Sequence, residues 1–272
     1  MRNRPSRTRG FHHLARRLRA AALRIVSPID RLALWINGKR RYPPIHLRRQ
    51  NGPLNGFERT AGEYAAYMAT LGGLAPDSHI LDVGCGSGAL ALMLGERLGP
   101  RGRYIGFDVD RPVINWTSAH LTDERFSFVH HDYWNATYNP GGERFRRLPA
   151  DDKWADIVIL KSVFTHLLPD DVTHYLREIR RVLRPSGTAL ITAFVFDQVD
   201  EVVRRRFPFE ADDYRYARAD SPESGVAYPR AWLLPAVAAA GLEGTILRGF
   251  WRPQDVRPIA YQDIVLARSA SS

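Results

Sequence analysis

Short apolar segments alternate with helical segments through the middle of the chain, and this alternation constrains the fold more than any other feature. Helical periodicity predicts helices at 89–99, 112–122 and 169–184, between the apolar segments. Parallel strands buried on both faces carry nearly continuous apolar residues, as these segments do. The pattern therefore predicts a doubly wound, mostly parallel sheet with helices on both faces. The predicted strands are HILDV (79–83), RYIGFD (103–108), FSFVHHD (126–132), ADIVIL (155–160) and TALITAFVF (188–196).

The segments on either side extend this pattern. A predicted helix at 57–73 precedes the first strand and ends at a Gly-Gly pair. The polar and aromatic segment 197–230 follows the fifth strand and gives no readable pattern. A helix at 230–241 and two strands, 243–250 and 260–268, complete the chain. The short loop between these strands predicts an antiparallel pair at the end of the sheet.

Charge divides the chain into two parts, a basic N-terminal arm at 1–50 and a globular domain at 51–272. The arm holds 14 Lys and Arg residues and one acid, Asp30, whereas the domain holds 25 basic and 28 acidic residues. A groove for nucleic acid needs many side chains that neutralise phosphates. The near-neutral domain therefore argues against nucleic acid as a partner.

The arm contains an amphipathic segment at 11–36, in which apolar residues recur at spacings of three and four. We expect a helix with an arginine-rich polar face that is broken near Pro28. Such a helix can lie as a peripheral element on an anionic membrane. It can equally pack on its own domain or on a partner subunit, and the sequence leaves both interpretations open.

Cys85 is the one cysteine of the chain, so no internal disulfide can form. No uninterrupted apolar run approaches the ~20 residues of a membrane-spanning helix. Arginines also interrupt the N-terminal apolar residues, unlike the apolar core of a secretory signal. We expect a cytoplasmic protein, peripheral to a membrane if the arm binds lipid.

The stretch DVGCGSGALA (82–91) is the strongest candidate for a ligand-binding loop, because it follows the first strand and opens a helix. Gly84, Gly86 and Ala89 fit the dinucleotide fingerprint G-x-G-x-x-G/A. The same spacing suits a loop that holds S-adenosylmethionine. The glycines alone do not separate these two ligands.

Three acids at strand ends, Asp82, Asp108 and Asp132, favour S-adenosylmethionine. Asp82 beside the loop would repel the pyrophosphate of a dinucleotide, but it would attract an ammonium or a sulfonium group. Asp108 is placed to accept both ribose hydroxyls of either ligand, so it does not discriminate. Asp132 is placed to bond an adenine amino group.

With these motifs the sequence resembles the class I S-adenosylmethionine-dependent methyltransferases, over roughly residues 57–268. The resemblance implies a Rossmann-like sheet of seven strands with an antiparallel last strand. The blocks that carry it are ILDVGCGSG (80–88), YIGFDVD (104–110), HHDYW (130–134), DIVILKSVFTHL (156–167) and YLREIRRVLRPSGTALIT (175–192).

The resemblance also implies the residues that hold S-adenosylmethionine. Asp82 with Gly84, Gly86 and Gly88 would line its methionine end, Asp108 its ribose, and Asp132 with Tyr133 its adenine. Cys85, Val109 and Lys161 lie in the same blocks and complete the predicted set.

The block SVFTHL looks most like bacterial methyltransferases that act on a small molecule, a glycan or a lipid. The Asn/Asp-Pro-Pro-Tyr/Phe motif of enzymes that methylate amino groups of bases is absent, since Leu160-Lys161-Ser162-Val163 occupies its place. We therefore expect methyl transfer to an oxygen or nitrogen of such an acceptor.

Two residues are candidates for chemistry. His166 follows the fourth strand and is our candidate general base, although a core or helix-capping histidine fits equally. Lys161 would orient the methionine carboxylate or an acidic substrate, although a strand-end lysine often reaches solvent. His130 and His131 are adjacent on a strand and point to opposite sides, so we expect no metal site.

Further aromatic residues after the strand ends are expected to rim the crevice, and the helix at 57–73 is expected to cover the cofactor as a lid. The lid residues would be Phe57, Arg59 and Tyr64. The rim residues would be Trp134, Tyr138, Phe164, Phe207, Phe209, Tyr214, Tyr216 and Tyr228.

Two other functions stay open. A chain of this fold can bind the cofactor without catalysis or activate a partner through its arm. A NAD-dependent oxidoreductase is the second alternative, against which Asp82 and the terminal strand pair argue. The sequence specifies neither the acceptor nor the oligomeric state.

Overall fold

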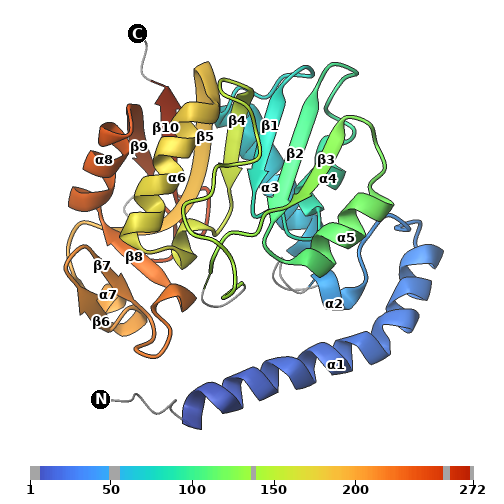
Figure 1. Cartoon of the computed structure of the whole chain (residues 1–272), viewed down its shortest axis with the longest axis horizontal. Helices are drawn as coiled ribbons and strands as arrows, with labels where there is room; N and C mark the ends of the chain where they lie inside the picture. The colour runs from blue at the N-terminus through green and yellow to red at the C-terminus, as the bar shows by residue number, and fades with distance from the viewer. Residues whose placement is uncertain (1–6, 49–55, 136–138, 254–257, 270–272) are drawn as a thin grey trace.

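A computed structural model describes residues 7–48, 56–135, 139–253 and 258–269, with side chains described from residue 22 onward. Its main sheet has the strand order β3-β2-β1-β4-β5-β10-β9 (Figure 1). Strands β1 to β5 run parallel, and β10 is antiparallel to both β5 and β9. The predicted seven-stranded arrangement and the antiparallel terminal pair are therefore confirmed. The bounds are β1 His79–Val83, β2 Arg103–Asp108, β3 Phe126–His130, β4 Ala155–Leu160, β5 Leu183–Phe196, β9 Leu242–Leu247 and β10 Asp263–Ser269.

Helices cover both faces of this sheet, as the apolar strands require. The helices are α1 Arg7–Ile36, α2 Ile45–Arg48, α3 Gly56–Leu71, α4 Ala89–Leu94, α5 Arg111–His120, α6 Pro169–Val182, α7 Glu201–Arg206 and α8 Arg230–Ala239, with 3₁₀ turns η2 Phe164–His166 and η3 Pro222–Ser224.

Two hydrophobic clusters lie on opposite sides of the strands. Leu176 of α6 and Val237 of α8 pack with Leu81 and Val158. Met68 of α3 and Leu94 of α4 pack with Ile80 and Ile157 on the other side. Successive residues of a strand thus belong to different clusters, because side chains point alternately to the two faces of the sheet.

The sequence did not predict a three-stranded extension of the sheet. β5 is 14 residues long, and its last three residues, Phe194–Phe196, pair with β8 (Val226–Pro229). β7 (Tyr214–Tyr216) pairs antiparallel with β8 and with β6 (Phe209–Ala211). These strands are three or four residues long, and a charged residue interrupts both β6 and β7, so none carries the long apolar run of the main strands. Residues 197–230 therefore form an α/β insertion beyond the end of β5, at lower left in Figure 1.

The predicted break of the N-terminal helix is wrong, because α1 continues through Pro28. Proline removes one backbone hydrogen bond, and the carbonyl left over must find another partner. Pro28 and Arg24 are both exposed, so water can donate a hydrogen bond to the Arg24 carbonyl, which has lost its backbone partner. The structure thus accommodates the proline within the helix.

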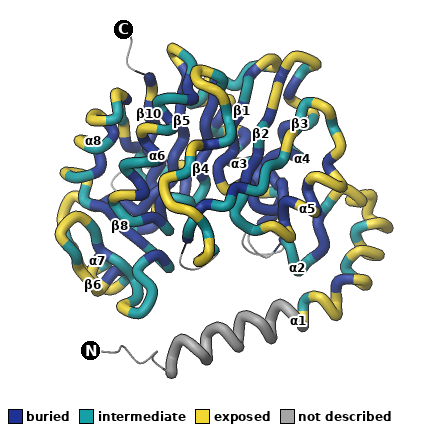
Figure 2. The backbone as a smooth tube through the Cα atoms, in the orientation of Figure 1, coloured by how far each residue is buried: buried dark blue, intermediate teal, exposed yellow. Residues whose placement is uncertain are grey.

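The C-terminal part of α1 is attached to the short helix α2 of the same arm. Asp30 accepts a hydrogen bond from the backbone N–H of Ile45, at 2.9 Å, and forms an ion pair with Arg48. The rest of α1 extends along the body and is largely exposed where its side chains are described (Figure 2). No helix of the described residues is long and apolar enough to cross a membrane.

Candidate functional site

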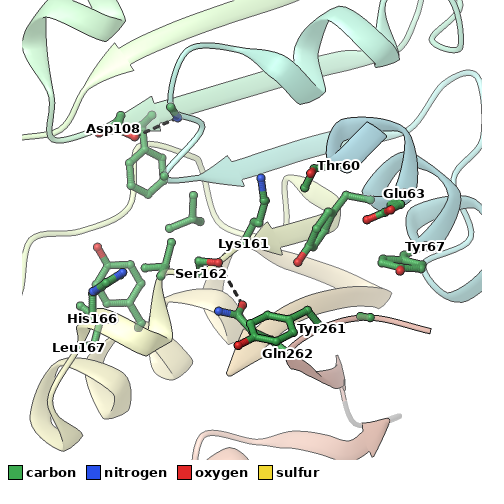
Figure 3. A pocket seen from close by; sticks show the side chains of 18 of the residues that line it. Thr60, Glu63, Tyr67, Asp108, Lys161, Ser162, His166, Leu167, Tyr261 and Gln262 are labelled. Carbon is green, nitrogen blue, oxygen red and sulfur yellow. Dashed lines mark hydrogen bonds between the residues drawn. The ribbon is translucent and has the colours of Figure 1, made fainter. Parts of the chain in front are cut away.

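A cavity of about 700 Å³ opens at the edge where the parallel strands end. Ligands of open α/β sheets bind at this edge. Its lining comes from the loop after β1, the end of β2, the residues after β4, helix α3 and the segment before β10 (Figure 3). One cavity therefore collects side chains from segments that are far apart in sequence.

The glycine loop forms one wall of this cavity through Gly84 and Gly86. Gly84 has φ of 72°, and a Cβ added there would come within 2.9 Å of Val163 Cγ2. Gly88, at φ of 77°, does not line the cavity; a Cβ there would meet Leu121 Cδ1 at 2.6 Å. Gly84 thus allows the loop to approach the residues after β4, whereas Gly88 allows α4 to pack beside α5. Cys85 lies buried within the loop and does not line the cavity.

Asp108 connects the glycine loop to the end of β2. Its carboxylate accepts hydrogen bonds of 2.9 Å from the backbone N–H groups of Gly86 and Asp110. Burial raises the pKa of Asp108, although these two hydrogen bonds favour the charged form. Asp108 and Val109 both line the cavity, and their predicted contact with the cofactor stays a prediction.

Asp82 lies behind the loop, and its side chain is not part of the cavity lining. Tyr104 donates a 2.5 Å hydrogen bond to its carboxylate. Burial raises the pKa of Asp82 from an ordinary 3.8 to about 6, against the opposing effects of Tyr104 and the Lys161 charge. The predicted contact between Asp82 and the ligand ammonium stays a prediction.

The two residues predicted for adenine differ in position. Tyr133 lines the cavity, and its hydroxyl donates to Asp171 at 3.0 Å. Asp132 lies outside the lining and accepts a 2.8 Å hydrogen bond from Asn139 Nδ2. Tyr133 is therefore the better placed of the pair to contact a ligand.

Lys161 extends from the end of β4 into the cavity rather than into solvent (Figure 3). Its ammonium lies 5.5 Å from the centre of the Tyr64 ring. Burial lowers the Lys161 pKa, whereas the negative charges of Asp82 and Glu63 raise it. Lys161 thus places a cation between the glycine loop and helix α3, where an anionic ligand group would be favoured.

His166 also lines the cavity, at the end of η2. Its Nδ1 lies 2.8 Å from the backbone carbonyl oxygen of Glu223. A carbonyl only accepts hydrogen bonds, so Nδ1 carries the proton and Nε2 is the basic nitrogen of the neutral ring. Sequence reasoning did not find this partner, which lies 57 positions away in the unpredicted insertion.

The insertion also holds the turn that carries His166. Tyr228 of β8 is fully buried, and its hydroxyl lies 2.7 Å from the Phe164 carbonyl and 2.6 Å from the Leu167 carbonyl. Both carbonyls belong to residues that flank His166. The insertion therefore fixes both the backbone and the ring orientation of this histidine.

The predicted aromatic rim is wrong for most of its members. Phe207 and Tyr228 are buried in the packing between the insertion and the sheet, and Phe209 lies outside the cavity lining. Trp134 does line the cavity, and Tyr138 lies outside the described residues. For the lid, Arg59 and Tyr64 face the cavity, whereas Phe57 is buried against other residues. Aromatic composition alone could not distinguish packing from lining.

His130, the last residue of β3, and His131, the residue after it, both face backbone carbonyl groups. His130 Nε2 lies 3.2 Å from the Val109 oxygen, and His131 Nε2 lies 2.9 Å from the Arg147 oxygen. The described residues contain no group of three His, Cys, Asp or Glu side chains that would hold a metal ion.

The sequence of residues 81–191 matches the family described as "Methyltransferase domain". This match covers less than half of the chain, and it agrees with the resemblance to the class I S-adenosylmethionine-dependent methyltransferases. The matched domain indicates S-adenosylmethionine as the cofactor, which argues against the nicotinamide alternative. The cavity brings together the glycine loop and Asp108, which the resemblance assigns to the cofactor.

Known methyltransferases share part of this sequence or its fold. Nocamycin O-methyltransferase of Saccharothrix syringae is 28% identical over 147 residues, 50% of this chain and 49% of that protein. The ubiquinone/menaquinone biosynthesis C-methyltransferase of Vibrio vulnificus is 27% identical over 159 residues, 53% of this chain and 57% of that protein. The chain thus spans about half the length of these curated relatives.

A solved structure with the same fold covers nearly the whole chain. The 1,6-didemethyltoxoflavin-N1-methyltransferase of Burkholderia thailandensis has a TM-score of 0.51 and 15% identity, and the match covers 99% of this chain and 93% of that one. Its crystals hold 1,6-didemethyltoxoflavin and S-adenosylhomocysteine. At this identity the similarity shows the fold.

The raised pKa of Asp82 predicts a pH-dependent stability. The folded state binds its proton more tightly than the unfolded state, so stability falls as pH rises from about 4 to 6. Asp82→Asn removes this ionisation. Urea unfolding measures the free energy of unfolding of both proteins at each pH. Between pH 4 and pH 7, the free energy of unfolding of Asp82→Asn minus that of wild type should increase by on the order of 3 kcal/mol. Asp77→Asn, at an exposed carboxylate, should show no such gain, and a wild type that gains stability relative to Asp82→Asn over this range would contradict the prediction.

Proposed function

We propose that this protein transfers the methyl group of S-adenosylmethionine to an oxygen or nitrogen of a small organic acceptor bound in the cavity. The observation that carries the proposal is that the glycine loop and Asp108 share one cavity with Lys161 and His166. The similar proteins include an O-, a C- and an N-methyltransferase, so the atom that receives the methyl group differs among them. Glycan and lipid acceptors belong to the same proposal.

The proposed cofactor site contains six residues that line the cavity. The backbone of Gly84 and Gly86 would lie against the methionine part, Asp108 would accept from the ribose hydroxyls, and Val109 with Tyr133 would flank the adenine. Lys161 would attract the methionine carboxylate. Asp82, Cys85, Gly88 and Asp132 would support this site from behind the lining.

The sulfonium of the bound cofactor supplies an already activated methyl group, so the protein has to orient the acceptor and take up a proton. We propose His166 as the general base. Its Nδ1–H donates to the Glu223 carbonyl, so Nε2 is the ring nitrogen that would take a proton from an acceptor hydroxyl or ammonium. The insertion would thus set the tautomer of the base.

Asp108→Ala should weaken binding of S-adenosylmethionine and S-adenosylhomocysteine at least tenfold, because charge-assisted hydrogen bonds contribute ~1.5–3 kcal/mol. Isothermal titration calorimetry measures both affinities. Asp213→Ala, at an exposed position in the insertion, is the matched control and should bind like wild type. Absence of binding of either ligand by folded wild-type protein would overturn the proposed function.

His166→Ala should lower the turnover number about a hundredfold, because a positioned general base contributes 10²–10⁴-fold. The assay measures S-adenosylhomocysteine formed with a metabolite extract, together with mass spectrometry of the methylated product. His120→Ala, on the outer helix α5, should leave turnover unchanged. Unchanged turnover in His166→Ala would remove the base from the mechanism, and no product from wild type would favour a non-catalytic or partner-activating protein.

We further propose that the arm, residues 1–50, binds the surface of an anionic membrane through α1. Four apolar residues form one exposed stripe of this helix: Ile25 (78% exposed), Ile29 (74%), Leu32 (59%) and Ile36 (68%). The arm carries 14 basic residues and one acid, and that acid, Asp30, is paired with Arg48. An apolar stripe with cationic surroundings suits the boundary between anionic headgroups and acyl chains. Figure 1 shows α1 along the side of the body at which β1 to β5 end, so the cavity would open towards the same membrane.

Vesicle flotation tests this contact. Wild type should bind vesicles of phosphatidylcholine with 30% phosphatidylglycerol and release them at high salt, as expected for a cationic surface. Leu32→Asp should weaken binding at least tenfold, since it removes an apolar side chain and adds a repelled charge. Ser118→Asp adds the same charge on α5 and should have little effect. Equal flotation of wild type and Leu32→Asp would exclude the proposed membrane contact.

A further inference from the structure

The half of the cavity opposite the glycine loop has no part in the proposed cofactor site. Helix α3 and the segment that leads into β10 form it. Its apolar wall is built from Tyr64, Tyr67, Phe250, Ile259 and Tyr261, and a polar side chain, Gln262, lies at its base (Figure 3). An apolar pocket with one placed polar group is the usual form of a small-molecule site.

Hydrogen bonds fix the orientation of the Gln262 amide. Its Oε1 accepts from the Ser162 hydroxyl at 3.0 Å and from the Thr192 hydroxyl at 2.6 Å. Thr192 Oγ1 itself accepts the backbone N–H of Ser162 at 2.7 Å, so the Thr192 proton is left to donate to Gln262. Both lone pairs of Oε1 are thereby used, and the Nε2 of Gln262 is directed away from these hydroxyls, toward the cavity (Figure 3). Within the described chain, no residue accepts a hydrogen bond from this nitrogen.

The backbone at this point is strained. Ser162 has φ of 57°, in the left-handed region that residues other than glycine rarely occupy. Such conformations are unfavourable for residues other than glycine and persist where surrounding contacts impose them. In this conformation the N–H of Ser162 donates to Thr192 and its hydroxyl donates to Gln262, so both groups take part in the hydrogen bonds that orient Gln262.

The aromatic wall is also held in place. The Tyr67 hydroxyl donates to the Ile259 carbonyl, which joins α3 to the segment before β10. Arg206 of α7 donates to the Tyr261 hydroxyl, and its guanidinium lies 5.3 Å from the centre of the Tyr261 ring. The insertion therefore supports one wall of this half of the cavity, and the lid helix supports the other.

We propose that this half of the cavity is an acceptor subsite for a planar apolar ring that carries a carbonyl or phenolate oxygen, which Gln262 Nε2 binds while Tyr67 and Tyr261 contact the ring. The inference rests on the proposed function and adds the chemical class of its acceptor. Gln262 presents donors to the cavity, so it selects an oxygen that accepts hydrogen bonds.

A pair of probes isolates the hydrogen bond. 1-Tetralone carries a carbonyl on a bicyclic ring, and tetralin is the same bicycle without that oxygen. Ligand-observed NMR titration in the presence of S-adenosylhomocysteine measures both affinities. Wild type should prefer 1-tetralone about fivefold, the size expected for one neutral hydrogen bond.

Two substitutions test whether Gln262 causes this preference. Gln262→Leu should reduce the preference to about one while tetralin binding is kept, because the apolar wall is intact. Gln262→Glu places an oxygen at the position of Nε2 and should reverse the preference, because two acceptor oxygens repel each other. Gln198→Leu, at an exposed glutamine outside the cavity, is the matched control and should behave like wild type.

The outcomes separate this inference from the proposed function. S-adenosylhomocysteine binding by each variant shows that the fold and the cofactor half are intact. A Gln262→Leu variant that keeps the wild-type preference, or a wild type that binds both probes equally, would overturn the subsite. If wild type discriminates the probes but binds no S-adenosylhomocysteine, the proposed function fails and the subsite stands.

Discussion

The hydrogen bonds of Asp108 are the interaction on which the rest of the site depends. Its carboxylate holds the N–H groups of Gly86 and Asp110, so the loop after β1 is attached to the end of β2. This attachment needs parallel neighbouring strands that end at one edge, which the β1–β2 register provides. The same edge then brings Lys161, which follows β4, and Gln262, which precedes β10, to the loop. One carboxylate thus connects the topology of the sheet with the shape of the cavity.

The insertion at 197–230 adds a second layer of control. Its 3₁₀ turn supplies the Glu223 carbonyl to His166, and Tyr228 holds the backbone on both sides of that histidine. Arg206 in the same insertion contacts Tyr261 at the other end of the cavity. The proposed base and the proposed acceptor wall are therefore supported by one structural unit, which would couple the choice of acceptor to proton transfer.

The fold was predictable to the extent that the residues carry local signals. The predicted strands 103–108 and 155–160 coincide with β2 and β4, because buried parallel strands are marked by continuous apolar residues. The strands of the insertion are only three or four residues long and so lack that signal, and an exposed helix tolerated Pro28 where the sequence predicted a break. Asp82 shows how far the sequence could predict the site. Its charge and its position before the glycine loop favoured a cationic ligand, but only the structure places it behind the loop, bonded to Tyr104.

The sequence by itself determined the doubly wound sheet, the glycine loop, the acid that ends β2 and, through them, the resemblance to methyltransferases and the cofactor that it implies. These features depend on local periodicity and on motifs within a few residues of each other. The tertiary structure decided which aromatic residues face the cavity, which carbonyl orients His166 and which way the Gln262 amide points. Those contacts join residues up to 100 positions apart, as Ser162 and Gln262 are, and no local pattern encodes such a distance.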